Sequence, residues 1–163
     1  MTDPLLRPLA DADWPAVRRI YAQGIATRKA TFETEVPSTE ALQEKWIPGQ
    51  RWVVELDGAV AGWAALTRVS ARECYRGVAE NSIYVDTDLG GRGLGSRLLR
   101  HQVEQARAGG FWTLQTSIFT DNEASLVLHQ RAGFRVVGQR ERIAQLDGIW
   151  RDTVFLELRF LTP

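Results

Sequence analysis

The sequence predicts a single domain of mixed α and β structure, in which helices cover a central sheet. Two Asp-Gly dipeptides, Asp57-Gly58 and Asp147-Gly148, each separate two apolar runs, a pattern typical of a β-hairpin. Between the hairpins, strand-like and helix-like stretches alternate along the chain. The length of 163 residues suits one domain with a core of its own. We therefore expect residues 1–163 to form one α/β (α+β) domain.

The first part of the chain is expected to hold a short strand, two helices and a hairpin. Residues 5–9 are mostly apolar and favour a strand. Residues 14–25 repeat apolar side chains at helical spacing, and 39–46 can form a shorter second helix. Residues 51–66 are two apolar runs around a two-residue turn, which predicts the first hairpin.

The second part of the chain alternates strands and helices before the final hairpin. Leu99, Val103 and Ala106 fall on one face of a helix, and Gly133 is suited to end another. The expected elements are a strand at 80–86, a helix at 93–108, a strand at 111–119, a helix at 122–132 and two strands within 134–160.

Composition and charge exclude several classes of function. Twenty basic residues balance twenty acidic ones, so no net field favours nucleic acid or an anionic membrane. Cys74 is the only cysteine, which excludes an internal disulfide and a multi-cysteine metal site, and we expect no metal. No run approaches the ~20 apolar residues of a membrane span, and the first residues do not resemble a signal peptide. We expect a cytoplasmic protein.

The stretch "DTDLGGRGLGSRLLR", residues 86–100, places four glycines in six positions directly before a predicted helix. Glycines let several backbone N–H groups converge, and a helix N-terminus adds partial positive charge, so the stretch suits an anionic group such as a phosphate. Ser96 follows Gly95 where a nucleotide-binding P-loop has lysine, and the spacing does not fit a dinucleotide fingerprint. A flexible turn without a ligand is the alternative.

The stretch "IYVDTDLGGRGLGSRLL" resembles the strand, loop and helix that bind acetyl-CoA in the GNAT superfamily of N-acetyltransferases. "NEASLVLHQRAGF" resembles the helix further along in that family. Together with "IYAQGIATRKATFETEVPS", "ARECYRGVAENSIYV" and "DGIWRDTVFLEL", it is similar to the phosphinothricin and methionine sulfoximine acetyltransferase branch. The resemblance implies a mixed sheet of about seven strands flanked by about four helices.

The resemblance also implies where acetyl-CoA would bind. In the family the loop amides hold the pyrophosphate, and the preceding strand hydrogen-bonds the pantetheine arm. Gly90 stands where the family usually has Gln or Arg, so the contribution of Arg92 stays open. The implied cofactor-binding residues are Ile83, Tyr84, Val85, Gly90, Gly91, Arg92, Gly93, Leu94, Gly95, Ser96 and Asn122.

Two residues are catalytic candidates. Glu80 matches the acidic position of the family and is proposed as general base, directly or through water; the alternative is an exposed glutamate at the start of a strand. His129 falls where many relatives place the acid that protonates CoA, and the alternative is a packed helix histidine. A backbone N–H within 83–85 is the expected oxyanion donor.

The resemblance implies a small amino-acid-like substrate, such as phosphinothricin or methionine sulfoximine or sulfone, and a homodimer. Arg72 is a candidate clamp for the substrate carboxylate. Another small amine or amino acid as substrate, or a module that binds acyl-CoA without turnover, are the alternatives. The implied substrate-binding residues are Phe32, Arg72, Tyr75, Arg76 and Trp150.

Overall fold

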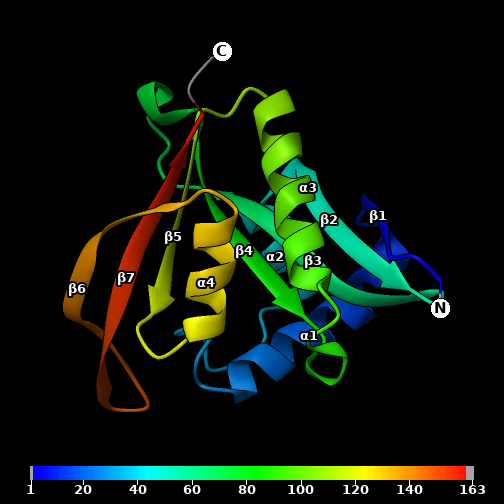
Figure 1. Ribbon diagram of the computed structural model, residues 1–163, viewed down its shortest axis with the longest axis horizontal. Helices are drawn as coiled ribbons and strands as arrows, with labels where there is room; N and C mark the ends of the chain where they lie inside the picture. Colours follow the sequence, from blue (N-terminus) through cyan, green and yellow to red (C-terminus); the bar gives the residue numbers. More distant parts are fainter. Residues whose placement is uncertain (1, 161–163) are drawn as a thin grey trace.

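The computed structural model describes residues 2–160, which form one seven-stranded mixed sheet flanked by helices (Figure 1). This confirms the predicted α+β fold. The strands are β1 (Leu5–Pro8), β2 (Trp46–Leu56), β3 (Ala59–Arg68), β4 (Val78–Val85), β5 (Thr113–Phe119), β6 (Arg135–Leu146) and β7 (Ile149–Arg159). The helices are α1 (Trp14–Ala26), α2 (Thr39–Lys45), α3 (Leu94–Ala108) and α4 (Glu123–Arg131), with short 3-10 turns η1 (Asp11–Asp13), η2 (Glu73–Tyr75) and η3 (Thr87–Leu89).

The sheet has the strand order β1-β2-β3-β4-β5-β7-β6 and is interrupted at its centre. Every neighbouring pair is antiparallel except β4 and β5, which are parallel. These two strands pair only from Val78↔Thr113 to Glu80↔Gln115 and then separate. Figure 1 shows the two arrows diverging toward their C-terminal ends. The sheet therefore opens where β4 runs on toward the glycine-rich loop.

The two faces of the sheet have different cores. On the face covered by α1 and α2, aromatic rings pack together: Trp46 lies 5.6 Å from Trp14 and 4.6 Å from Trp63 between ring centroids. On the face covered by α3 and α4, the buried side chains are mostly aliphatic. Since successive side chains of a strand point to opposite faces, alternate residues of β4 belong to different cores.

The structure differs from the predicted element boundaries mainly in β2. The sequence predicts a strand from residue 51, whereas β2 starts at Trp46, directly after α2. Pro48 and Gly49 are residues that usually interrupt a strand, and the pairing of β2 with β3 is irregular between Trp46 and Arg51. Trp46 nevertheless pairs with Thr67 because its side chain is buried in the aromatic core.

Candidate active site

A cavity of about 300 Å³ opens where β4 and β5 separate. Both strands line it beyond their last paired residues, and the loop between α1 and α2 and one face of α4 complete its wall. The lining residues are Tyr21, Ala30, Thr31, Phe32, Glu33, Lys45, Glu80, Asn81, Ser82, Ile83, Tyr84, Thr116, Ser117, Ile118, Phe119, Asn122, Ser125, His129 and Thr153. The cavity thus reaches both faces of the sheet through the gap between the two strands.

Glu80 lies at the point where β4 and β5 part. It pairs with Thr67 of β3, which in turn pairs with Trp46 of β2, so Glu80 points toward the α1/α2 face. The residue is exposed, but its carboxyl group opens into the cavity, where surrounding protein displaces part of its water. This desolvation raises the pKa of Glu80, while the charges of Lys45 and Arg140 act to lower it. A carboxylate with a raised pKa is suited to accept a proton.

His129 lies on the other side of β4, in α4, and is 4% exposed. Its Nδ1 lies 2.8 Å from the backbone oxygen of Ser125, which only accepts, so Nδ1 carries the proton and donates it. Its Nε2 lies 3.1 Å from Nδ2 of Asn81 and accepts from that amide. Burial lowers the pKa of His129 and keeps the ring neutral. In this state neither ring nitrogen has a proton free for the cavity.

Asn81 is 3% exposed and lines the same cavity. Its Nδ2 is used by His129, and its Oδ1 is buried without a hydrogen-bond partner in the part of the chain that the structure describes. A buried acceptor of this kind costs stability unless a ligand or water satisfies it. Asn81 therefore presents an acceptor at the cavity wall.

The loop between α1 and α2 forms one wall of the cavity and is held through three consecutive carbonyl groups. Arg151 donates to the carbonyl of residue 28 at 2.9 Å, Asn122 to that of residue 29 at 3.0 Å, and Tyr84 to that of residue 30 at 3.4 Å. Phe32 then packs edge-on against Phe119, with 4.7 Å between ring centroids. The wall thus depends on side chains from β7, β4 and the start of α4.

Asn122 and Tyr84, both predicted to bind the cofactor, are partly engaged in these contacts. Asn122 also caps α4, because its Oδ1 accepts from the backbone N–H of Ser125. The Tyr84 ring stacks on Trp63 at 4.7 Å between centroids, on the α1/α2 face. Gly24 makes room for this ring, since a Cβ there would lie 2.4 Å from a Tyr84 ring carbon. The Tyr84 side chain therefore takes part in the aromatic packing and in holding the loop, and Tyr84 lines the cavity as well.

The glycine-rich loop ends in the N-terminus of α3, as predicted. Gly91 and Gly93 have φ angles of 78° and 74°, which favour glycine, and a Cβ on either would meet no atom within 4 Å. Gly93 is the N-cap residue and provides no side chain to cap the first amides of the helix. A second cavity of about 450 Å³ lies beyond Ser96, between α3 and α4, and includes Arg100 and Arg131. The free N-terminus and these cations are suited to an anionic ligand.

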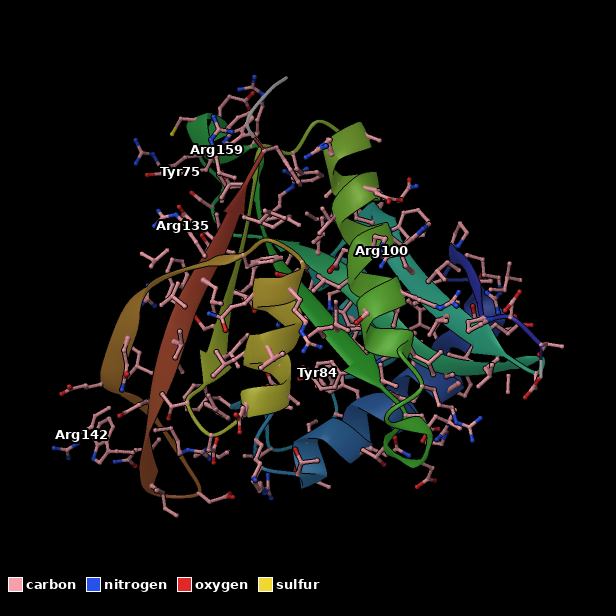
Figure 2. All side chains as sticks on the ribbon, in the orientation of Figure 1. Tyr75, Tyr84, Arg100, Arg135, Arg142 and Arg159 are labelled. Carbon is pink, nitrogen blue, oxygen red and sulfur yellow. The ribbon has the colours of Figure 1, made fainter. Side chains whose placement is uncertain are left out.

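The structure does not bring every predicted substrate residue to the cavity. Phe32 lines it, whereas Arg72, Tyr75 and Arg76 lie in or beside η2, outside the lining. Figure 2 shows Tyr75 near Arg159, toward the opposite end of β4 from Tyr84. Trp150 is 48% exposed near the turn of the β6–β7 hairpin.

Three residues of this region were not singled out by the sequence: Lys45, Asn81 and Arg151. Two features of the sequence could have pointed to Lys45 and Asn81. Lys45 is one of only two lysines in the chain, and Asn81 directly follows the predicted base. Nothing in the sequence near Arg151 indicates its contact with the loop between α1 and α2. The exposed Cys74 lies in η2, away from the cavity.

Residues 14–134 match the family model described as "Acetyltransferase (GNAT) family". The chain belongs to this family. As a GNAT acetyltransferase it is 34% identical over 160 residues to an L-methionine sulfoximine/L-methionine sulfone acetyltransferase of Pseudomonas aeruginosa, covering 94% of this chain and 92% of that protein. It is 31% identical over 158 residues to a phosphinothricin N-acetyltransferase of Alcaligenes faecalis, covering 93% and 80%.

Among solved structures, this acetyltransferase is similar to a phosphinothricin acetyltransferase from Sinorhizobium meliloti in complex with acetyl-CoA. The TM-score is 0.87 at 30% identity, with 96% of this chain and 88% of that chain covered. The predicted resemblance to the phosphinothricin and methionine sulfoximine acetyltransferases is thus confirmed. Within residues 2–160, no helix is both long and apolar enough to cross a membrane.

Proposed function

We propose that this acetyltransferase transfers an acetyl group from acetyl-CoA to the α-amine of a small amino-acid-like substrate, such as L-phosphinothricin or methionine sulfoximine or sulfone. The observation that carries the proposal is the position of Glu80. Its carboxyl group, with a raised pKa, faces the cavity at the point where β4 and β5 part. The relatives that act on these substrates support the choice of substrate class.

The residues present fit acetyl-CoA. The uncapped N-terminus of α3 and the glycines before it would hold the pyrophosphate through backbone amides. The unpaired edges of β4 and β5 would hold the pantetheine arm, and the cavity with Arg100 and Arg131 would take the rest of the nucleotide. When bound, acetyl-CoA supplies a thioester as the acyl donor.

Glu80 would remove a proton from the substrate ammonium, directly or through water, so that the amine becomes a nucleophile. Its raised pKa makes it a better base than an ordinary glutamate. Backbone N–H groups within 83–85 would stabilise negative charge on the acyl oxygen, an effect of about 3 kcal/mol for one such donor.

The role of His129 as a proton donor stays a prediction. Its present hydrogen bonds leave no proton for the cavity, so this role would require protonation of the ring. Donation from Nε2 would need a second proton on a buried ring whose pKa is lowered. The resting arrangement supports a positioning role instead, in which His129 holds Asn81 at the cavity wall.

We also propose that the protein forms a homodimer and works in the cytoplasm. The support for a dimer is the edge of the sheet: Val136, Val137, Ile143, Ile149 and Trp150 of β6 and β7 are each 47% to 64% exposed. Exposed apolar side chains along an edge hairpin favour an interface. Trp150, predicted to contact substrate, would then lie at or near this interface.

The deciding experiment measures thiol release from acetyl-CoA with methionine sulfoximine, methionine sulfone, phosphinothricin, ordinary amino acids and a simple polyamine. The proposal expects saturable turnover with the first three, with kcat/KM above that of the other amines. Higher kcat/KM for an ordinary amino acid or the polyamine would move the assignment to that substrate. Tight acetyl-CoA binding without turnover of any compound would favour the non-catalytic module.

A further inference from the structure

Lys45 has no role in the proposed reaction so far, yet it faces the same cavity as Glu80. An α-amino acid carries its amine and its carboxylate on one carbon, so a cation that binds the carboxylate must lie close to the base that serves the amine. Within the described residues 2–160, Lys45 is the only lysine or arginine that lines this cavity. The cavity otherwise carries the acidic side chains of Glu33 and Glu80 and the neutral ring of His129.

The strand register explains how Lys45 comes to lie on the side of Glu80. Lys45 is the last residue of α2 and directly precedes Trp46. Trp46 pairs with Thr67, and Thr67 pairs with Glu80, so the end of α2 lies at the level of Glu80, two strands away. Two inter-strand spacings are about 10 Å, which two long side chains pointing to one face can bridge.

The electrostatics agree with this geometry. The charge of Lys45 acts to lower the pKa of Glu80, as does that of Arg140 in β6. Because Lys45 and Glu80 line the same cavity and lie at one level of the sheet, the geometry suits one small zwitterion that contacts both.

The arginines predicted to clamp the carboxylate are differently placed. Arg72 lies over the Tyr75 ring, 5.6 Å from its centroid, and Arg76 lies over Trp112 at 5.2 Å and 3.6 Å from the Glu73 carboxylate. Neither lines the cavity. Among Lys45, Arg72 and Arg76, only Lys45 is placed to contact the carboxylate of a substrate in the cavity.

We propose that the ammonium group of Lys45 binds the α-carboxylate of the substrate and thereby selects amino acids over simple amines. The inference rests on the proposed function, because it needs a substrate with a carboxylate beside the reacting amine. Lys45 would then determine specificity, whereas Glu80 would serve the chemical step. The ordinary role of a lysine at the end of a helix is to interact with the helix dipole, which affects stability alone.

The experiment compares methionine sulfone with the matching amine that lacks the carboxylate, for the wild type, Lys45→Gln, Lys45→Arg and Lys29→Gln. Lys29 is the only other lysine, its side chain is exposed, and it does not line the cavity. We expect Lys45→Gln to raise the KM for methionine sulfone about 10- to 100-fold, the effect of losing a charged hydrogen bond. The KM for the amine and the Kd of acetyl-CoA stay unchanged. Lys45→Arg restores most of the loss, and Lys29→Gln behaves as the wild type.

The pH profile gives an independent readout that a purely structural lysine would not change. With the amine as substrate, the acid limb of kcat/KM for Lys45→Gln is expected to move to higher pH, because a charge that lowers the pKa of Glu80 is lost. Arg140 and Glu33 are unchanged in this variant, so the shift reports on Lys45. An acid limb that does not move would place Lys45 too far from Glu80 and overturn the proposal.

Two further outcomes separate this inference from the proposed function. If the wild type prefers methionine sulfone and Lys45→Gln keeps that preference while Arg72→Gln loses it, Arg72 is the clamp and the inference on Lys45 is wrong. If the wild type acetylates the amine as well as methionine sulfone, the amino-acid assignment itself is wrong, and the carboxylate site is overturned with it.

Discussion

Both faces of the sheet border the gap between β4 and β5, but they contribute different chemical groups to the candidate site. On the α3/α4 side the groups proposed to bind acetyl-CoA are backbone amides at Gly91 to Ser96, and the polar side chains Asn81 and His129 are neutral. On the α1/α2 side the groups are charged: Glu80 and Lys45. In the proposed reaction, backbone groups would therefore form the half of the site that binds the acetyl donor, and a few side chains would form the half that binds the acetyl acceptor. Substitutions on the two faces should separate donor binding from acceptor chemistry.

The largest effect is expected from Glu80→Gln on the acceptor side. Loss of a general base should lower kcat about 10²- to 10³-fold, while the Kd of acetyl-CoA measured by calorimetry stays nearly the same. Glu141→Gln, an exposed glutamate of β6 outside the cavity, is the matched control. A kcat within a few-fold of the wild type would remove Glu80 from the mechanism.

The same variant has an expected effect on stability. The pKa of Glu80 is higher in the folded protein than in the unfolded chain. Between these two pKa values the folded state binds more protons than the unfolded state, so the free energy of unfolding falls as pH rises through that interval. At pH 7 the partly desolvated charge of Glu80 destabilises the folded protein. Glu80→Gln should therefore be at least as stable as the wild type in urea unfolding.

An intermediate effect is expected on the donor side, from Gly93→Ala. Its φ of 74° and its position at the N-terminus of α3 predict strain of about 1 kcal/mol and a methyl group beside the anion site, so the Kd of acetyl-CoA should rise about tenfold. Gly110→Ala is the control, with a φ of 87° past the other end of α3. It should lose similar stability without changing the Kd. Equal Kd values for the two variants would contradict an anion site in the loop.

The smallest effect is expected from the pH dependence of stability at His129. Burial lowers the pKa of His129 in the folded protein. As pH drops below about 6.5, the unfolded chain therefore binds a proton on this histidine before the folded protein does. The free energy of unfolding should therefore fall as pH drops through this range, and His129→Gln should remove part of that fall. His101→Gln should remove less, because His101 is less buried. The same slope in wild type and His129→Gln would mean that the pKa of His129 is the same in the folded protein as in the unfolded chain.

The glycine-rich loop and the helix that follows it could be predicted from the sequence because their signal is local. Consecutive glycines before an amphipathic helix lie within one short segment, and both hairpins are marked by their own Asp-Gly turns. The acceptor half depends on contacts across strands. Lys45 reaches the level of Glu80 only through Trp46 and Thr67, and β2 begins earlier than Pro48 and Gly49 suggest.

The residues predicted from family position alone lie in different places relative to the cavity. Phe32 lines the cavity, but Arg72 and Arg76 lie outside it, because the loop before β4 folds into η2 near the far end of the strand. Arg151 holds the cavity wall through a carbonyl more than a hundred residues away, and such a contact leaves no pattern in a single sequence.

The short pairing of β4 with β5 also divides the molecule along its sequence. Strands β1 to β4 and helices α1 to α3 come from residues 5–108, and the remaining elements come from residues 113–159, with three residue pairs joining the two half-sheets. A cut between Gly109 and Gly110 would give two fragments, one with Glu80 and the glycine-rich loop, the other with His129 and Phe119. Neither fragment would contain the whole of the proposed site. The proposed reaction would thus require the two contiguous halves of the chain to dock, and activity on reassembly would report that docking directly.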